Sequence, residues 1–68
     1  MANIAKVIRV IGQSDESFAQ AARVAVNEAG QTVRDISGAH VIEMSAVVEN
    51  GEITMFRTTV DIAFGVER

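Results

Sequence analysis

Residues 40–66 read HVIEMSAVVENGEITMFRTTVDIAFGV, and this stretch decides the fold. At its centre stands Asn50-Gly51, a dipeptide typical of two-residue β-turns, because both residues of a type I′ turn need a positive φ. Apolar and β-branched residues dominate on both sides of the turn. The sequence therefore predicts a β-hairpin with strands at residues 40–49 and 52–66.

Side chains alternate between the two faces of a strand, so the hairpin also predicts which residues face the core. We expect the even-numbered positions of the last strand to face it: Thr54, Phe56, Thr58, Val60, Ile62, Phe64 and Val66. The other face is predicted to carry five cross-strand pairs, provided that no bulge shifts the register. These pairs are Val48–Ile53, Ala46–Met55, Met44–Arg57, Ile42–Thr59 and His40–Asp61.

The first half of the chain predicts one strand and one helix. Residues 5–11 form a β-branched run that stops at Gly12. Ser14 is a candidate N-cap, followed by two acidic residues that suit the positive end of a helix dipole. An apolar stripe then recurs every three or four residues, and Ser37-Gly38 is a suitable stop. The stripe comprises Phe18, Ala22, Ala25, Ala29, Val33 and Ile36.

The resulting order, strand, helix, strand, strand, defines one small α+β domain over residues 1–68. A chain of this length supports little core, and it has no cysteine for a disulfide or a thiolate metal site. One helix of roughly 28 Å also leaves much of a strand of roughly 50 Å uncovered. We therefore expect copies of the chain to assemble and to cover the exposed face.

Charge and composition exclude several classes of function. The net charge is −3 and the chain has no Trp or Tyr, which disfavours nucleic-acid binding. No apolar run approaches the length of a membrane span, and the N-terminus lacks the apolar core of a signal peptide. We expect a soluble, cytoplasmic protein.

Several segments together resemble the dodecin family over essentially the whole chain. They are KVIRVIGQS at residues 6–14, the alanine-rich helix, AHVIE at 39–43 and FRTTVDIAF at 56–64. The resemblance implies a three-stranded antiparallel sheet wrapped around one helix, and twelve copies that form a hollow sphere. It also implies ligand binding without catalysis. Some members bind flavins such as riboflavin or FMN in stacked pairs, for storage or quenching, and some bind coenzyme A.

Two positions depart from the flavin-binding pattern. Gly38 stands where those members have a flavin-stacking Trp, and Arg57 stands where they have a Gln. The Trp-less pattern also resembles the calcium dodecins. Calcium needs six to eight oxygen ligands, and the acidic residues of this chain are too scattered to supply them within one copy. The metal ligands therefore stay unassigned, and copies would have to share any calcium site.

The candidate ligand residues are Gly38, His40, Met44, Met55 and Arg57. The planar guanidinium of Arg57 suits a phosphate or a carboxylate, although an ion pair between copies would serve it equally. The methionines suit either a ligand or an interface. His40 opposite Asp61 is expected to be structural, the alternative being the base and orienter of a small enzyme. A purely structural shell is the remaining alternative to a ligand-binding protein.

Overall fold

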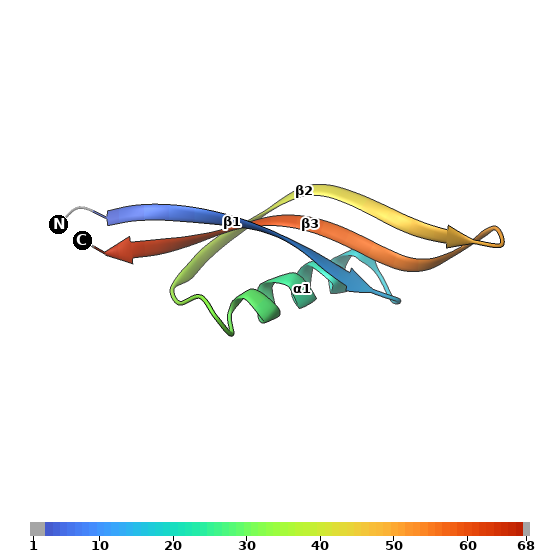
Figure 1. The fold of residues 1–68 in the computed structure, drawn as a ribbon, viewed down its shortest axis with the longest axis horizontal. Helices are drawn as coiled ribbons and strands as arrows, with labels where there is room; N and C mark the ends of the chain where they lie inside the picture. The colour runs from blue at the N-terminus through green and yellow to red at the C-terminus, as the bar shows by residue number, and fades with distance from the viewer. Residues whose placement is uncertain (1–2, 68) are drawn as a thin grey trace.

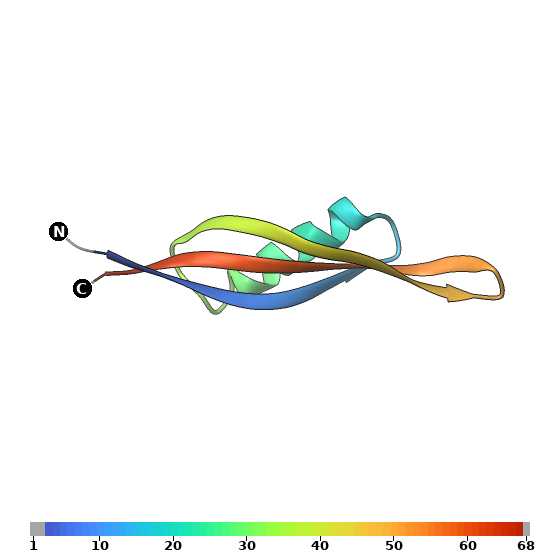
Figure 2. The same cartoon turned by 90° about the horizontal axis from the view of Figure 1, so that it is seen from above.

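The computed structural model describes residues 3–67 and contains four elements. In chain order they are β1 (Asn3–Ser14), α1 (Phe18–Ala29), β2 (Ile36–Glu49) and β3 (Glu52–Glu67). The strands form one antiparallel sheet in the order β1-β3-β2, with α1 against one face (Figures 1 and 2). The predicted β-α-β-β fold is confirmed, and its last strand is the central one.

The hairpin is the element that the sequence predicts best. Asn50 and Gly51 have φ values of 53° and 78°, the positive pair that a type I′ turn requires. Glu49 and Glu52 face each other directly before and after the turn. The long ladder between β2 and β3 starts from this point.

The pairing of β2 with β3 differs from the prediction in its middle part. Val48 lies opposite Ile53 and His40 lies opposite Asp61, as predicted, but the register shifts between these two pairs. Met44 consequently lies opposite Thr58, on the helix side of the sheet. One irregularity lies between Val47 and Val48, and another lies between residues 41 and 43.

The predicted placement of Met44 and Ala46 on the uncovered face is therefore wrong, and so is the predicted pairing of Ile42 with Thr59. Ala46 lies opposite Phe56, and Ile42 is left out of the ladder. The cause is the pair of bulges, each of which adds one residue to one strand and reverses the alternation until the next bulge restores it. A simple two-residue period cannot reveal such insertions.

The helix begins three residues later than predicted. Ser17 is the N-cap, and its hydroxyl accepts a 2.9 Å hydrogen bond from the amide of Gln20. Ser14 is the last residue of β1, and its hydroxyl accepts from the amide of Glu16 in the connecting turn. The extension of β1 past Gly12 moves the start of the helix from one serine to the other.

The helix also ends earlier than predicted, at Ala29. Gly30 is the C-cap, and its amide donates a 2.9 Å hydrogen bond to the carbonyl of Val26. Ser37 and Gly38 therefore do not end the helix but lie in β2.

The core lies between α1 and the even-numbered side of β3. Thr58, Val60 and Ile62 are buried there, as the alternation predicts. The Thr58 hydroxyl donates a 2.9 Å hydrogen bond to the carbonyl of Phe18, and the rings of Phe18 and Phe56 meet edge to face. Three alanines form the buried face of the helix, namely Ala21, Ala25 and Ala29. Ala21 was missing from the predicted stripe.

Gly12 allows β1 to pass directly beneath the helix. A Cβ atom added at Gly12 would lie 1.9 Å from the carbonyl oxygen of Ala21 and 2.9 Å from the amide nitrogen of Ala25. The obstacle is helix backbone, which cannot rotate away. The prediction that Gly12 ends the first strand is therefore wrong, since β1 continues to Ser14. Gly12 instead sets how closely α1 approaches β1.

This core leaves much apolar surface uncovered. The chain measures 54 × 19 × 13 Å with a radius of gyration of 14.0 Å, against about 11 Å for a compact chain of this length. Its surface of 4942 Å² exceeds the roughly 4,200 Å² usual for a monomer of this mass. Exposed large hydrophobic side chains are Ile4, Val7, Ile11, Val41, Ile42, Met44, Val48 and Ile53. In the described residues, no helix is long and apolar enough to cross a membrane.

We predict that Gly12→Ala lowers the free energy of unfolding by about 3 kcal/mol, the upper part of the usual range for overpacking, because the helix backbone must move. Urea unfolding at fixed protein concentration measures this change. Gly65→Ala is the matched control, since a Cβ at Gly65 meets nothing within 4 Å. Equal stability of the two variants would contradict the close approach.

Candidate ligand-binding face

We call the side of the sheet that points away from α1 the outer face. The register and the alternation of side chains define its residues on all three strands. Its central row, on β3, consists of Met55, Arg57, Thr59, Asp61 and Ala63. The flanking rows are Val7, Arg9, Ile11 and Gln13 on β1, and Gly38, His40, Glu43, Ser45 and Val47 on β2.

Asp61 is bound by Arg9 of β1. Two hydrogen bonds join the guanidinium to the carboxylate, Nε to Oδ1 at 2.7 Å and Nη2 to Oδ2 at 3.0 Å. These hydrogen bonds lower the pKa of Asp61, with smaller contributions from the charges of Arg9 and His40, and they raise the pKa of Arg9. His40 lies on the other side of Asp61, and among the described residues the carboxylate is hydrogen-bonded by Arg9 and not by His40.

Arg57 is oriented by a neutral partner. Its Nε donates a 3.0 Å hydrogen bond to Oε1 of Gln13 on β1, and Ser45 lies opposite on β2. Within the described residues Arg57 forms no ion pair, so the terminal nitrogens of the guanidinium have no acidic partner in this copy. The outer face therefore combines one neutralised row, at Asp61, with one row that keeps its positive charge.

Four of the five predicted ligand residues lie on the outer face: Gly38, His40, Met55 and Arg57. They follow the long axis of the sheet and do not converge on one point. Gly38 pairs with Ala63 towards one end of β3, whereas Met55 lies towards the hairpin. Met44 is separated from them by the bulge and lies on the helix side, opposite Thr58, so its predicted position beside Arg57 on the outer face is wrong.

Arg9 and Gln13 were not predicted from the sequence as the partners of Asp61 and Arg57. Their odd-numbered positions in a strand that starts near residue 5 could have placed both side chains on the outer face. The sequence did not indicate which residues of β1 pair with which residues of β3. β1 and β3 are separated by the helix and by β2, and no local turn fixes their register.

The outer face offers no phenylalanine, tyrosine or tryptophan ring to a planar ligand, and His40 supplies its one imidazole among the described residues. Phe56 and Phe64 lie on the even-numbered side of β3, and Phe18 lies in the helix. Gly38 is exposed, and a Cβ atom there would meet nothing within 4 Å. In the part of the chain that the structure describes, no three acidic or histidine side chains gather into a metal site.

The fold and this face define a small β-α-β-β subunit whose sheet is covered on one side only. Residues 4–67 match the family model of dodecin. The chain therefore belongs to the dodecin family.

Two groups of relatives are similar along nearly their full length. The calcium dodecin of Mycobacterium tuberculosis is 37% identical over 62 residues, which are 91% of this chain and 87% of that protein. The crystal structure of a calcium-chelating calcium dodecin of that organism, described as having a novel calcium-binding site, has 40% identity and a TM-score of 0.80. The match covers 90% of this chain and 87% of the chain in that crystal structure. The dodecin of Streptomyces coelicolor has 27% identity, a TM-score of 0.93 and coverages of 97% and 94%.

The Arg9–Asp61 pair predicts a specific pH dependence of stability. Because its pKa in the folded chain lies below the ordinary 3.8, Asp61 contributes stability that is fully present above that value and is lost as the pH falls through the lowered pKa. Arg9→Gln should therefore be less stable than the native chain at pH 6. The difference should shrink towards zero near pH 2 in urea unfolding.

Lys6→Gln is the control, since it removes an exposed cation from the same strand without touching Asp61. A loss of stability that is equal at pH 6 and pH 2 in Arg9→Gln would show that the pair does not act through its charge. The pKa of Asp61, followed by NMR, should rise in Arg9→Gln and stay unchanged in Lys6→Gln.

Proposed function

We propose that this protein is a homo-oligomeric binding protein that holds a small ligand between copies and does not turn it over. The observation that carries the proposal is the imbalance of apolar surface. Eight large hydrophobic side chains are at least 40% exposed, whereas Val60 and Ile62 are the large hydrophobic residues among the buried ones. Such a sheet is sheltered only when other copies cover it. We expect the twelve-subunit assembly that the resemblance implies.

Calcium is the ligand that we favour. A relative with 37% identity is a calcium dodecin. Because one copy gathers no set of three metal-binding side chains among its described residues, the six to eight oxygens that calcium takes must come from several copies. Glu43 is the acidic residue of the outer face that is exposed and not held by Arg9, so it is our first candidate ligand.

Flavin and coenzyme A are less well supported as ligands. A flavin bound between outer faces would find apolar and polar side chains and the small imidazole of His40, but no phenylalanine, tyrosine or tryptophan ring, and each aromatic pair adds about 1 kcal/mol beyond area burial. The fixed guanidinium of Arg57 would suit the phosphates of coenzyme A, but no second observation on this chain supports that ligand.

The absence of turnover is supported by the chemistry of the face. The chain has no cysteine, and its one carboxylate beside the histidine is bound by Arg9. A histidine without an orienting acid and without a nearby nucleophile is poorly equipped for acid–base or covalent catalysis. Binding is the function that these residues can perform.

Native mass spectrometry and calorimetry test the proposal. We expect a particle of about twelve times the 7.3 kDa chain. After removal of metal by a chelator, calcium titration should give a saturable signal that magnesium at equal concentration does not reproduce. Glu43→Gln should weaken calcium binding at least tenfold, whereas Glu28→Gln, an exposed change on the helix, should not.

An assembled particle that does not bind calcium would support the proposed assembly but contradict calcium as the ligand. A monomer at micromolar concentration would contradict the proposed function as a whole. A yellow particle as purified would instead assign flavin.

The position of Gly38 predicts how flavin binding could be created. Gly38→Trp places a ring on the outer face where there is open space, and we expect about fivefold tighter riboflavin binding than in Gly38→Leu, in line with the stacking contribution. Quenching of riboflavin fluorescence measures both affinities. Equal quenching by the two variants would place Gly38 away from any ligand-stacking position.

A further inference from the structure

One flank of α1 carries a hollow of about 290 Å³. It is lined by Ala22, Arg23, Val26 and Asn27. Ala22 and Val26 are half-buried and form its apolar part. Because the helix packs over β1 and β3 and barely reaches β2, this flank is not closed by the chain's own sheet.

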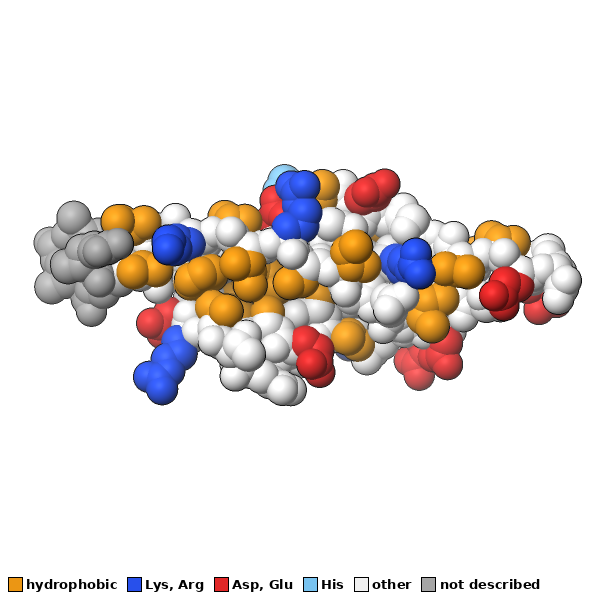
Figure 3. All heavy atoms as spheres, viewed as in Figure 1, with side chains coloured by type: hydrophobic (Ala, Val, Ile, Leu, Met, Phe, Trp, Pro, Cys, Tyr) orange, Lys and Arg blue, Asp and Glu red, His pale blue; other side chains and the backbone are white. Residues whose placement is uncertain are grey.

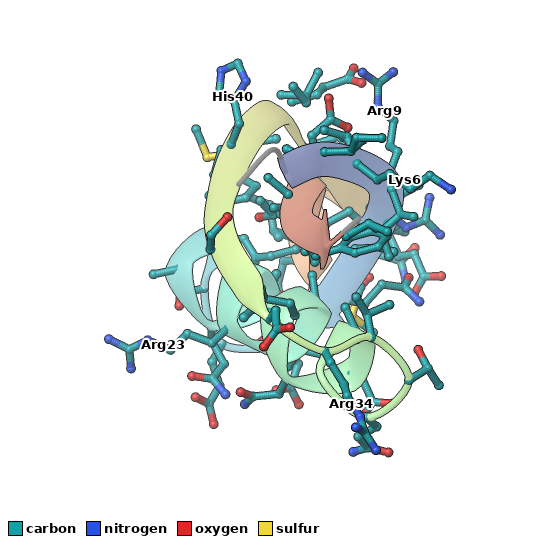
Figure 4. All side chains as sticks on the ribbon, turned by 90° about the vertical axis from the view of Figure 1, so that its left-hand side faces the viewer. Lys6, Arg9, Arg23, Arg34 and His40 are labelled. Atoms are coloured by element: carbon teal, nitrogen blue, oxygen red, sulfur yellow. The ribbon has the colours of Figure 1, made fainter. Side chains whose placement is uncertain are left out.

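Arg23 stands at the rim of this hollow. Its side chain is exposed, and within the described residues it forms neither a hydrogen bond nor an ion pair. Figure 4 shows that Arg23 projects on the side of the molecule where β2 lies, away from β1. On that side β2 turns Val41 and Met44 towards the helix layer, and both are about half exposed. The flank is thus an apolar surface with one unpaired positive charge.

The hairpin tip has the complementary chemistry. Val48 and Ile53 face each other across β2 and β3 and are 60% and 52% exposed. Glu49 and Glu52 form the next pair, one directly before the turn and one directly after it. Residues 41–56 contain no lysine or arginine, so these two like charges are not neutralised locally and repel each other.

The tip cannot reach the helix flank of its own chain. In Figure 1 the hairpin extends beyond the end of α1 at which the helix begins, and Figure 3 shows acidic side chains at this extended end. A surface that complements the tip is an apolar hollow with a free cation on another molecule. A second copy of this chain supplies both.

We propose that the hairpin tip of one copy docks into the helix-flank hollow of the next. Val48 and Ile53 cover Ala22 and Val26, and the two glutamates meet Arg23. This inference rests on the proposed self-assembly and names the contact that builds it. The contact joins two different surfaces, so repeating it around an axis gives a ring when the rotation closes.

Charge reversal in two places tests this contact. Arg23→Glu and the double variant Glu49→Arg/Glu52→Arg should each weaken assembly at least tenfold, measured as the protein concentration of half-dissociation in light scattering. The three changes together restore opposite charges and should return that concentration to within about threefold of the native chain. Arg34→Glu is the matched control, because Arg34 is also exposed and lies after the helix. It should assemble like the native chain.

Circular dichroism of each variant separates loss of contact from loss of folding. Arg23→Glu and the glutamate variant assembling as well as Arg34→Glu would overturn the contact while leaving self-assembly intact. So would failure of the triple variant to recover while its secondary structure is native. A native chain that is itself monomeric would instead remove the proposed function, and the contact with it.

Discussion

The structure depends on the mismatch between one short helix and one long sheet. α1 has 12 residues and spans roughly 18 Å, whereas β3 has 16 residues and spans roughly 53 Å. The helix also covers the sheet only across β1 and β3. Small side chains make this cover close, because three alanines and Gly12 bring the two backbones together, but they bury little area. The core that a single chain can form by itself is therefore incomplete.

The polar residues of the outer face are hydrogen-bonded between β1 and β3, the two strands that the helix covers. Asp61 and Arg57 lie on the central strand, and each is held by a residue of β1, namely Arg9 and Gln13. Within residues 3–67, no side chain of β2 hydrogen-bonds to Asp61 or Arg57, so the polar groups of β2 on this face stay available. β1 and β3 thus form a fixed platform, while β2 and the hairpin tip are the parts of the sheet with most unsatisfied surface. This division explains why we place the contact between copies at the hairpin.

The sequence predicts well those features that local chemistry determines. Asn50-Gly51 fixes the turn because Asn and Gly readily adopt the two positive φ values that a type I′ turn requires, without help from distant residues. The even-numbered side of β3 is readable since Thr58, Val60 and Ile62 keep strict alternation after the bulge. The order of elements follows from the same patterns.

Features that depend on distant partners were not predicted. Two serines near the helix start, Ser14 and Ser17, are equally good N-caps in isolation. Ser17 is the N-cap because β1 extends as far as Ser14. The bulges that move Met44 to the helix side leave no mark in the alternation of β2. The role of Gly12 becomes visible only when Ala21 is placed above it. For the ligand-binding face, residues could be proposed by parity, but their partners on β1 could not.

The dependence of stability on protein concentration tests the central claim most directly. If copies of the chain supply the missing cover, folding and assembly are linked, and the urea concentration at half-unfolding must rise as the total protein concentration is increased a hundredfold. The account predicts such a rise, together with a loss of helix and sheet signal on strong dilution. A midpoint that stays constant over this range, with the native signal retained, would show that the single chain shelters its own sheet and would contradict the account.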